Sequence, residues 1–138
     1  MTDSARDAAG AQELIDTIET LYRGLGDRVA FDRRLDPGVT VWESADPRLL
    51  RGIAELDELR GPAIPAAART VPLPLVVPTN IVSDAWGDTG VVRYVLEVRA
   101  DEHAAVSEHV RVTDVLRRNA DGWRIVHHHA QDLDPAGF

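Results

Sequence analysis

The chain lacks two residue types that carry much of enzyme chemistry. It contains no cysteine, which excludes disulfides, thiolate-bound metals, iron–sulfur clusters and cysteine nucleophiles. It also contains no lysine, because all 15 basic residues are arginine. Schiff-base chemistry, a lysine-anchored pyridoxal phosphate and a P-loop lysine are therefore excluded as well. Histidine, aspartate, glutamate, tyrosine, serine and arginine remain as the reactive side chains.

Long apolar runs and clusters of positive charge are missing too. No stretch approaches the roughly 20 apolar residues of a membrane-spanning helix. The first residues, with Asp3, Arg6 and Asp7, lack the apolar core of a signal peptide. The net charge of −8 would repel a phosphate backbone, and no basic cluster offsets it. We therefore expect a cytoplasmic protein with neither a membrane nor a nucleic acid as partner.

What is present is typical of a globular protein. The apolar fraction is 44% and the charged fraction 28%, and 138 residues are enough for one domain with its own core. We expect a single domain over residues 1–138, with loose ends at about 1–7 and 133–138.

The order of the expected elements predicts the fold class. Helical spacing of apolar residues predicts helices, and alternating β-branched residues predict strands. The expected helices cover 8–25, 28–35 and 53–60, and the expected strands cover 39–44, 80–86, 91–101, 106–118 and 123–131. A proline-rich connector, 62–78, separates the two groups and would form part of a pocket rim. This order predicts an α+β fold, a cone-shaped, curved antiparallel sheet with the N-terminal helices packed on its concave face.

Strand alternation predicts which polar side chains enter the hollow. Val39, Val41 and Glu43 share one face of their strand, and Val110, Val112, Asp114 and Leu116 share one face of theirs. In the last strand Trp123, Ile125, His127, His129 and Gln131 group together. The more apolar face should point to the helices, which places Glu43, Asp114, His127 and His129 inside. The face of strand 91–101 that carries Arg93, Glu97 and Arg99 cannot be assigned, and an arginine in the cavity would favour an anionic ligand.

Two carboxylates and two imidazoles in a hollow indicate a polar pocket. Their burial is costly unless they bond to one another or shift their pKa values. A carboxylate beside an imidazole in a dry cavity suits proton transfer. Two alternatives remain open. The four groups could form a purely structural network, or His127 and His129 with Asp114 or Glu43 could form a 2-His-1-carboxylate metal site, which His128 on the other face could not join.

Several segments carry a resemblance to a known superfamily. They are 35–42 (LDPGVTVW), 50–52 (LRG), 111–115 (RVTDV) and 121–129 (DGWRIVHHH). With them, nearly the whole chain resembles the SnoaL-like branch of the nuclear transport factor 2-like superfamily, whose fold is cystatin-like. The resemblance implies the fold, a ligand-binding pocket and no metal or cofactor. It does not imply one reaction, because the superfamily hosts cyclases, isomerases, dehydratases, epoxide hydrolases and oligomerisation modules.

The ketosteroid isomerases share this fold and imply residue roles. The position of their general base corresponds to Glu43, and that of their oxyanion-hole aspartate to Asp114. His127 and His129 stand where they have apolar wall, and Tyr22 is the nearest candidate for their phenolic donor. We therefore expect a small-molecule-binding protein acting as a cofactor-free isomerase, cyclase or lyase. Glu43 or His127 would be the base, Asp114 with His129 would polarise the substrate, and ligand contacts would come from Tyr22, Trp86, Val112 and Gln131.

The outer sheet face leads to a different hypothesis. Proteins of this fold commonly dimerise through that face, and Val115, Val126 and Ala130 are expected there beside Arg111, Thr113 and His128. Trp42 points away from Glu43 and would belong to the same surface or cap the rim of the cone. The alternative to an enzyme is therefore a non-catalytic homodimeric binding or association module.

Overall fold

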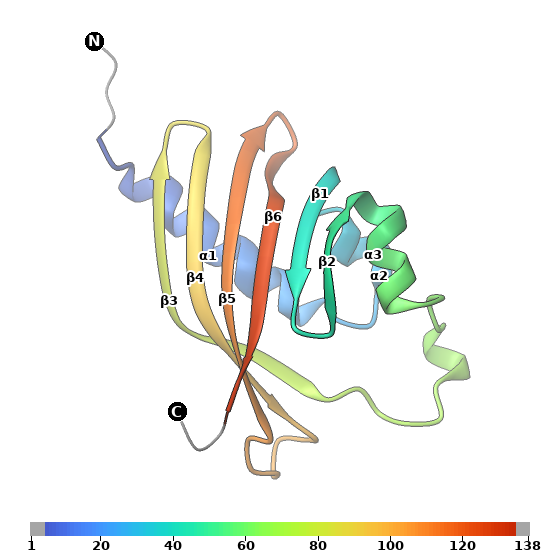
Figure 1. Cartoon of the computed structure of the whole chain (residues 1–138). Coiled ribbons are helices and arrows are strands. Elements are labelled where there is room, and N and C mark those ends of the chain that lie inside the picture. The colour runs from blue at the N-terminus through green and yellow to red at the C-terminus, as the bar shows by residue number, and fades with distance from the viewer. Residues whose placement is uncertain (1–4, 135–138) are drawn as a thin grey trace.

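The fold is built on a six-stranded sheet (Figure 1). The computed structural model describes residues 5–134 of the chain. The strand order is β2-β1-β6-β5-β4-β3. The strands are β1 (Leu35–Glu43), β2 (Asp46–Arg51), β3 (Leu75–Trp86), β4 (Thr89–Arg99), β5 (Glu108–Asn119) and β6 (Gly122–Leu133). Strands β3 to β6 follow one another as antiparallel neighbours, and β1 pairs with β6 in parallel. The sheet is therefore mixed, which differs from the antiparallel sheet expected from the sequence.

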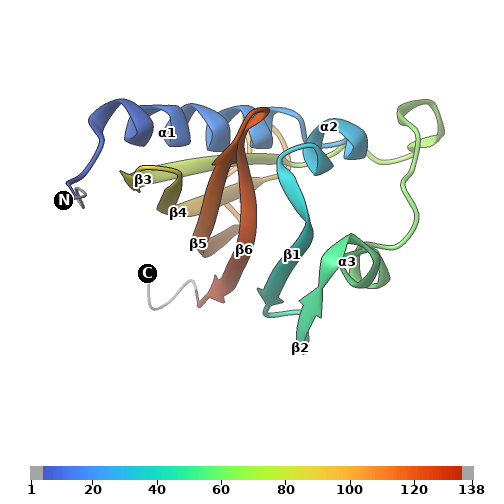
Figure 2. The same ribbon diagram turned by 90° about the horizontal axis from the view of Figure 1, so that it is seen from above.

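The helices lie against one face of this sheet. They are α1 (Ala8–Arg23), α2 (Arg28–Asp32) and α3 (Gly52–Arg60), and a single 3-10 turn covers Ala66–Ala68. Figure 2 shows α1 running across the sheet on one side, with α2 continuing its line beyond β6. Helix α1 begins at Asp7, whose carboxylate accepts a hydrogen bond from the Gly10 amide at 3.0 Å. The α+β architecture expected from the sequence is confirmed.

One contiguous core forms between α1 and the sheet. Helix α1 buries Leu14, Ile18 and Leu21, which recur at the spacing of one helix face. On the strands the core takes alternate residues, such as Val39 and Val41. Gly90 on β4 permits the close approach of α1, because a Cβ atom there would overlap the Leu14 side chain.

No helix in residues 5–134 is long and apolar enough to cross a membrane.

Two local expectations change in the structure. The interval between the expected strand 39–44 and the expected helix 53–60, for which no strand is predicted, contains β2, which pairs antiparallel with β1 (Thr40 opposite Arg51, Val41 opposite Leu50). Asp7 and Leu133, expected in loose ends, are instead the cap of α1 and the last residue of β6. Of the other expected loose residues, 1–4 and 135–138 lie outside the described part of the chain.

Candidate active site

A β-bulge in β6 decides which histidine enters the concave side. Leu116 of β5 pairs with Ile125 of β6, but its neighbour Val115 pairs with His127, so β6 carries one extra residue there. Up to Ile125 the inward residues alternate as the sequence predicts. Beyond the bulge the alternation is displaced by one, and His128 lies opposite the buried Asp114.

The prediction that His127 and His129 point into the hollow is therefore wrong. Both lie on the outer face, where their rings meet the indole of Trp42 edge-on at centroid distances of 5.7 and 5.8 Å. The Nδ1 atom of His127 is 2.7 Å from the hydroxyl of Thr40. Ala130, expected outside, is buried in the core for the same reason. No glycine or proline marks the bulge, so the local sequence carries no signal for it.

The inward histidine belongs to a buried chain of hydrogen bonds. Asp114 is 0% exposed, and its Oδ1 atom lies 2.6 Å from Nδ1 of His128. Its other oxygen accepts a hydrogen bond from the hydroxyl of Tyr94. The hydroxyls of Tyr94 and Tyr22 are 2.9 Å apart. Because the Tyr94 proton is directed to Asp114, Tyr22 is the donor in that pair, and the chain runs from α1 through β4 and β5 to β6.

Burial and charge shift the pKa values along this chain. Burial, and next the charge of Asp114, raise the pKa of Tyr22. Burial also raises the pKa of Tyr94, followed by the effects of Tyr22 and Asp114. For His128, burial alone would lower the pKa, but the charges of Asp114 and Glu43 and the bond to Asp114 outweigh it. The result is a pKa of His128 above its usual 6.5, which favours an imidazolium next to neutral phenols.

Glu43 stands where the sequence predicts, at the end of β1 on the inward face. Its Oε1 atom lies 3.9 Å from Nε2 of His128, the ring nitrogen that Asp114 leaves unused. Both side chains line a cavity of about 190 Å³ whose other walls are mainly apolar, among them Leu21, Leu35, Val41 and Leu56. Both also line an adjoining compartment of about 270 Å³ that reaches Ser44 and Asp132. The pair thus stands between two hollows.

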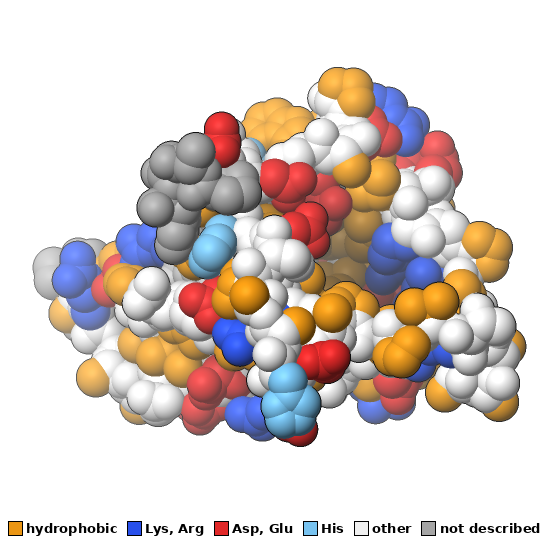
Figure 3. All heavy atoms as spheres, turned by 90° about the horizontal axis from the view of Figure 1, so that it is seen from below, with side chains coloured by type: hydrophobic (Ala, Val, Ile, Leu, Met, Phe, Trp, Pro, Cys, Tyr) orange, Lys and Arg blue, Asp and Glu red, His pale blue; other side chains and the backbone are white. Residues whose placement is uncertain are grey.

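The space-filling view shows how this region opens to the surface. In Figure 3 the molecule is hollowed, with hydrophobic side chains deep inside, acidic side chains on one edge and basic ones on the opposite wall. Tyr22, a predicted ligand contact, lines both compartments, and Phe31 of α2 stands beside it in both. A ligand here would have an apolar surrounding and a polar pair at one wall.

The remaining predicted contacts lie elsewhere. Trp86 is 36% exposed on the outer face of β3, opposite Thr89, and Gln131 is exposed and accepts a hydrogen bond from Arg111. Val112 is buried in the core but belongs to neither compartment. The predictions of ligand contact for Trp86 and Gln131 are therefore not supported by their positions.

Sequence reasoning missed Tyr94 and His128. Tyr94 lies on the face of β4 opposite Arg93 and Arg99, and the polarity of that strand did not indicate which face was buried. Once Val92 is paired with Asp114, Tyr94 must point inward two residues later. His128 was missed because of the bulge.

The bulge also removes the metal alternative drawn from the sequence. His127 and His129 lie on the outer face, whereas Asp114 and Glu43 lie on the inner one, so they cannot share an ion. Within residues 5–134, no group of three or more His, Asp or Glu side chains is arranged to hold a metal. The inner groups that remain are suited to moving protons, with a carboxylate and an imidazolium facing one cavity.

Comparisons with solved structures show the fold. The chain resembles the calcium/calmodulin-dependent kinase II hub of S. rosetta, with TM-score 0.73 and 22% identity, covering 92% of this chain and 99% of that one. A proposed ketosteroid isomerase from Parabacteroides distasonis gives TM-score 0.66 and 20% identity, over 89% and 87%. A proposed dehydratase of the NTF2-like family from Streptomyces avermitilis gives TM-score 0.69 and 18% identity, over 91% and 97%. These likenesses show the NTF2-like, or cystatin-like, fold.

The sequence itself identifies the family. The SnoaL-like domain matches residues 30–130, a span from α2 to the buried end of β6 that includes Glu43, Tyr94, Asp114 and His128. The chain belongs to the SnoaL-like domain family. A comparison with curated proteins finds no match.

Proposed function

We propose that this protein binds a small organic molecule in the cavity beside Glu43 and His128 and moves a proton within it without a cofactor. The observation that carries the proposal is the pair itself. Nε2 of His128 and Oε1 of Glu43 are 3.9 Å apart, both side chains line the cavity, and Asp114 holds the other ring nitrogen of His128. The polarising role expected for His129 passes to His128, and Glu43 takes the role of base for which His127 was the alternative.

The geometry supports a division of labour between base and acid. Glu43 would remove a proton from a carbon next to a carbonyl group, and the C–H electron pair would form the carbon–carbon double bond of an enol. The carbonyl oxygen would accept the Nε2 proton of His128, whose imidazolium Asp114 stabilises. In an isomerisation, a C=C bond conjugated with the enol shifts as the proton of Glu43 is added to a carbon further along it, and the enol O–H returns its proton to Nε2 of His128, which restores the carbonyl group. In a lyase reaction, a hydroxyl on the neighbouring carbon would instead leave with the Glu43 proton as water, and the enol would again return its proton to His128.

The fold comparisons agree with this class of reaction at a coarse level. Solved structures of the same fold include a proposed ketosteroid isomerase and a proposed dehydratase, and general acid–base catalysis can serve isomerisation and elimination alike. The residue assignment does not come from them. It depends on the Asp114–His128–Glu43 arrangement of this chain.

Deuterium exchange tests the proposal without a known substrate. The protein is incubated in D₂O with 2-tetralone, a cyclic ketone with acidic protons next to its carbonyl group, and NMR follows their loss. We expect exchange above the buffer rate. In Glu43→Gln it should fall by about 10²- to 10⁴-fold, the usual contribution of a general base. The outer-face variant His127→Gln serves as the matched control and should keep the wild-type rate. Equal rates in Glu43→Gln and the wild type would remove Glu43 from the mechanism.

A second candidate function, homodimeric association, is favoured by the exposed outer face. Trp42 is 46% exposed there, with His127 and His129 against its ring. Val82 on β3 is 56% exposed on the same face. Exposed apolar side chains on a sheet face are a feature of interaction surfaces. We expect Trp42→Ser to shift a dimer toward the monomer in light scattering, while Val29→Ser on α2 leaves the mass unchanged. A wild-type monomer at high concentration would contradict this candidate.

A further inference from the structure

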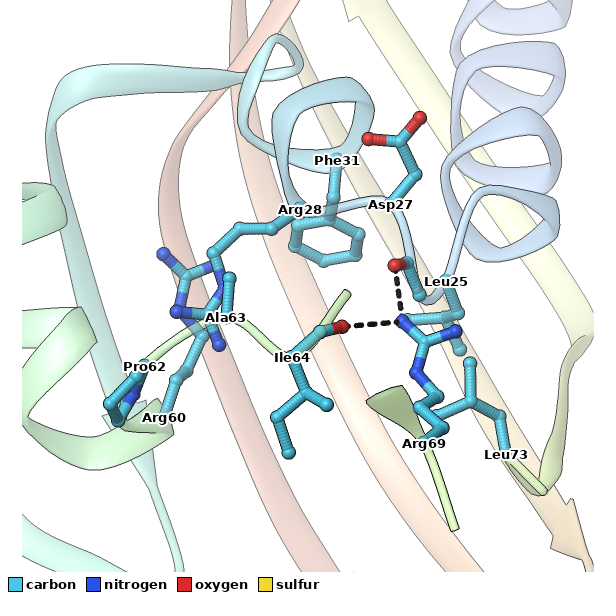
Figure 4. A pocket seen from close by; sticks show the side chains of 11 residues that line it. Leu25, Asp27, Arg28, Phe31, Arg60, Pro62, Ala63, Ile64, Arg69 and Leu73 are labelled. Carbon is cyan, nitrogen blue, oxygen red and sulfur yellow. Dashed lines mark hydrogen bonds between the residues drawn. The ribbon is translucent and has the colours of Figure 1, made fainter. Parts of the chain in front are cut away.

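A further hollow, apart from the two compartments beside the Glu43–His128 pair, lies next to the active-site cavity and has a different chemical character. It measures about 320 Å³ and is formed by α2, the end of α3 and the proline-rich connector that follows (Figure 4). Its lining is apolar at Leu25, Phe31, Ile64 and Leu73. The polar lining consists mainly of three arginines, Arg28, Arg60 and Arg69, which Figure 4 shows around the same space.

The arginines outnumber the carboxylates that pair with them. Arg60 binds Asp32 at 2.7 Å and also Asp57, and Arg28 reaches the same Asp57 at 3.6 Å. Arg69 donates to the backbone carbonyls of Gly26 and Ile64, and it pairs with no carboxylate in residues 5–134. Three guanidiniums thus share two carboxylates within ion-pair distance, which leaves one positive charge in excess.

Two further details favour an anion at this place. Asp27 also lines the hollow, but its carboxylate accepts a hydrogen bond from the Ala30 amide, and Figure 4 shows it directed away from the guanidiniums. The Nε atom of Arg60 is buried and has no hydrogen-bond partner within residues 5–134. In a chain with net charge −8, long-range attraction of anions is weak, so these local donors would have to provide the affinity.

The arginine-lined hollow shares two lining residues with the cavity of the Glu43–His128 pair. Phe31 and Arg60 line both spaces. A molecule that reaches from one to the other would pass the Phe31 ring, with the guanidiniums at one end and the acid–base pair at the other. The negative charges of Glu43 and Asp114 disfavour a carboxylate at their end, so only one orientation of a charged ligand is favourable.

We infer that the substrate is an amphiphilic monocarboxylic acid, which deepens the proposed function and rests on it. The carboxylate binds Arg69 together with Arg28 or Arg60, and the apolar body extends past Phe31 to Glu43 and His128. A single negative charge matches the single excess positive charge, whereas a phosphate dianion would leave one charge unpaired. The planar guanidinium also fits the two oxygens of a carboxylate.

Calorimetry with paired probes tests this substrate class. Hexanoate, octanoate and decanoate are titrated into the protein, each beside its neutral amide of equal length. We expect the carboxylate of the best-fitting length to bind at least tenfold more tightly than its amide, and added salt to weaken only the carboxylate. In Arg69→Gln the affinity for the carboxylate should fall about ten- to a hundredfold, the loss typical of one charge-assisted hydrogen bond, with the amide unchanged. Arg117→Gln, an exposed arginine on β5, is the matched control and should bind as the wild type does.

The outcomes separate this inference from the proposed function. Equal binding of acid and amide by the wild type, or no binding of either at any length, overturns the inference, and neither result depends on whether a variant folds. An unchanged acid-to-amide ratio in folded Arg69→Gln also overturns it. Preference for the acid without any deuterium exchange would support the inference and contradict the proton-transfer role. Deuterium exchange without a preference for the acid over its amide would support the proton-transfer role and overturn the inference.

Discussion

On β6, three consecutive histidines occupy two different environments. His128 lies against the buried Asp114 at 2.6 Å, and its pKa is raised because the nearby carboxylates outweigh burial. His127, the preceding residue, lies on the outer face, where burial and the two neighbouring histidines lower its pKa. Its contacts are the Trp42 ring and the Thr40 hydroxyl, neither of which carries charge. The same side chain is thus driven toward opposite protonation states on the two faces of one strand.

This difference shows that the face of the sheet, rather than the residue type, decides what each histidine can do. An imidazolium beside a cavity can donate a proton, whereas a neutral imidazole beside an indole ring packs against it, with one ring nitrogen as hydrogen-bond donor and the other as acceptor. Changing one residue on each face therefore tests whether the two environments differ as the contacts indicate.

The largest effect is expected from Asp114→Ala, which removes the partner that distinguishes the inner histidine. The substitution leaves His128 and the Tyr94 hydroxyl buried without their acceptor. Breaking a buried ion pair by removing one partner typically lowers the free energy of unfolding by about 3–5 kcal/mol. Urea unfolding followed by circular dichroism measures the change.

Asp132→Ala provides the control for that measurement. Asp132 lies near the end of β6 and its side chain is exposed, so its loss should change the free energy of unfolding by less than about 0.5 kcal/mol. If Asp114→Ala lowers the free energy of unfolding as little as Asp132→Ala does, the buried network does not contribute to stability. The contrast between the two faces of the sheet would then be wrong.

A smaller effect is expected from His128→Gln, because the glutamine amide can still donate a hydrogen bond to Asp114, and the part that reports the charge of His128 is a pH dependence. The pKa of His128 in the folded state is above its unfolded value of 6.5, so the folded protein binds more protons between the two values. The stabilisation by His128 is therefore complete below about pH 6.5 and is lost as the pH rises through the folded-state pKa, with a slope of at most about 1.4 kcal/mol per pH unit. Urea unfolding from pH 6 to 9 should show this slope in the wild type and not in His128→Gln. Identical slopes would mean that Asp114 does not hold His128 charged.

The smallest effect is expected from His127→Gln, and it has the opposite sign. The pKa of His127 is lowered in the folded state, so the unfolded chain binds more protons just below the usual value. Stability should therefore fall as the pH drops from about 6.5 through the folded-state pKa of His127, and the substitution should reduce that loss. The side chain is partly exposed, and solvent keeps the change small. Proton NMR titration of the histidine rings is the direct measurement, and a His127 that titrates above His128 would reverse the comparison.

Much of the site followed from the alternation of residues along β1 and β5. The alternation of Val39, Val41 and Glu43 on β1 predicts the inward carboxylate, and that of Val112, Asp114 and Leu116 on β5 predicts the buried one. The helix periodicity of α1 likewise predicts its buried face. These predictions depend only on residues two, three or four positions apart, and such spacing survives in any regular strand or helix.

What the sequence determined by itself is the α+β class, the inward carboxylates of Glu43 and Asp114, and the absence of cysteine and lysine chemistry. The tertiary structure alone decided which histidine joins them. One extra residue in β6 transfers the inward position from His127 to His128, and the pairing of β4 with β5 brings Tyr94 onto Asp114. The arrangement of Arg28, Arg60 and Arg69 around one hollow is likewise a property of packing, since they come from α2, α3 and the connector that follows. A bulge and a packed loop are set by the register and contacts of distant segments, which no local spacing encodes.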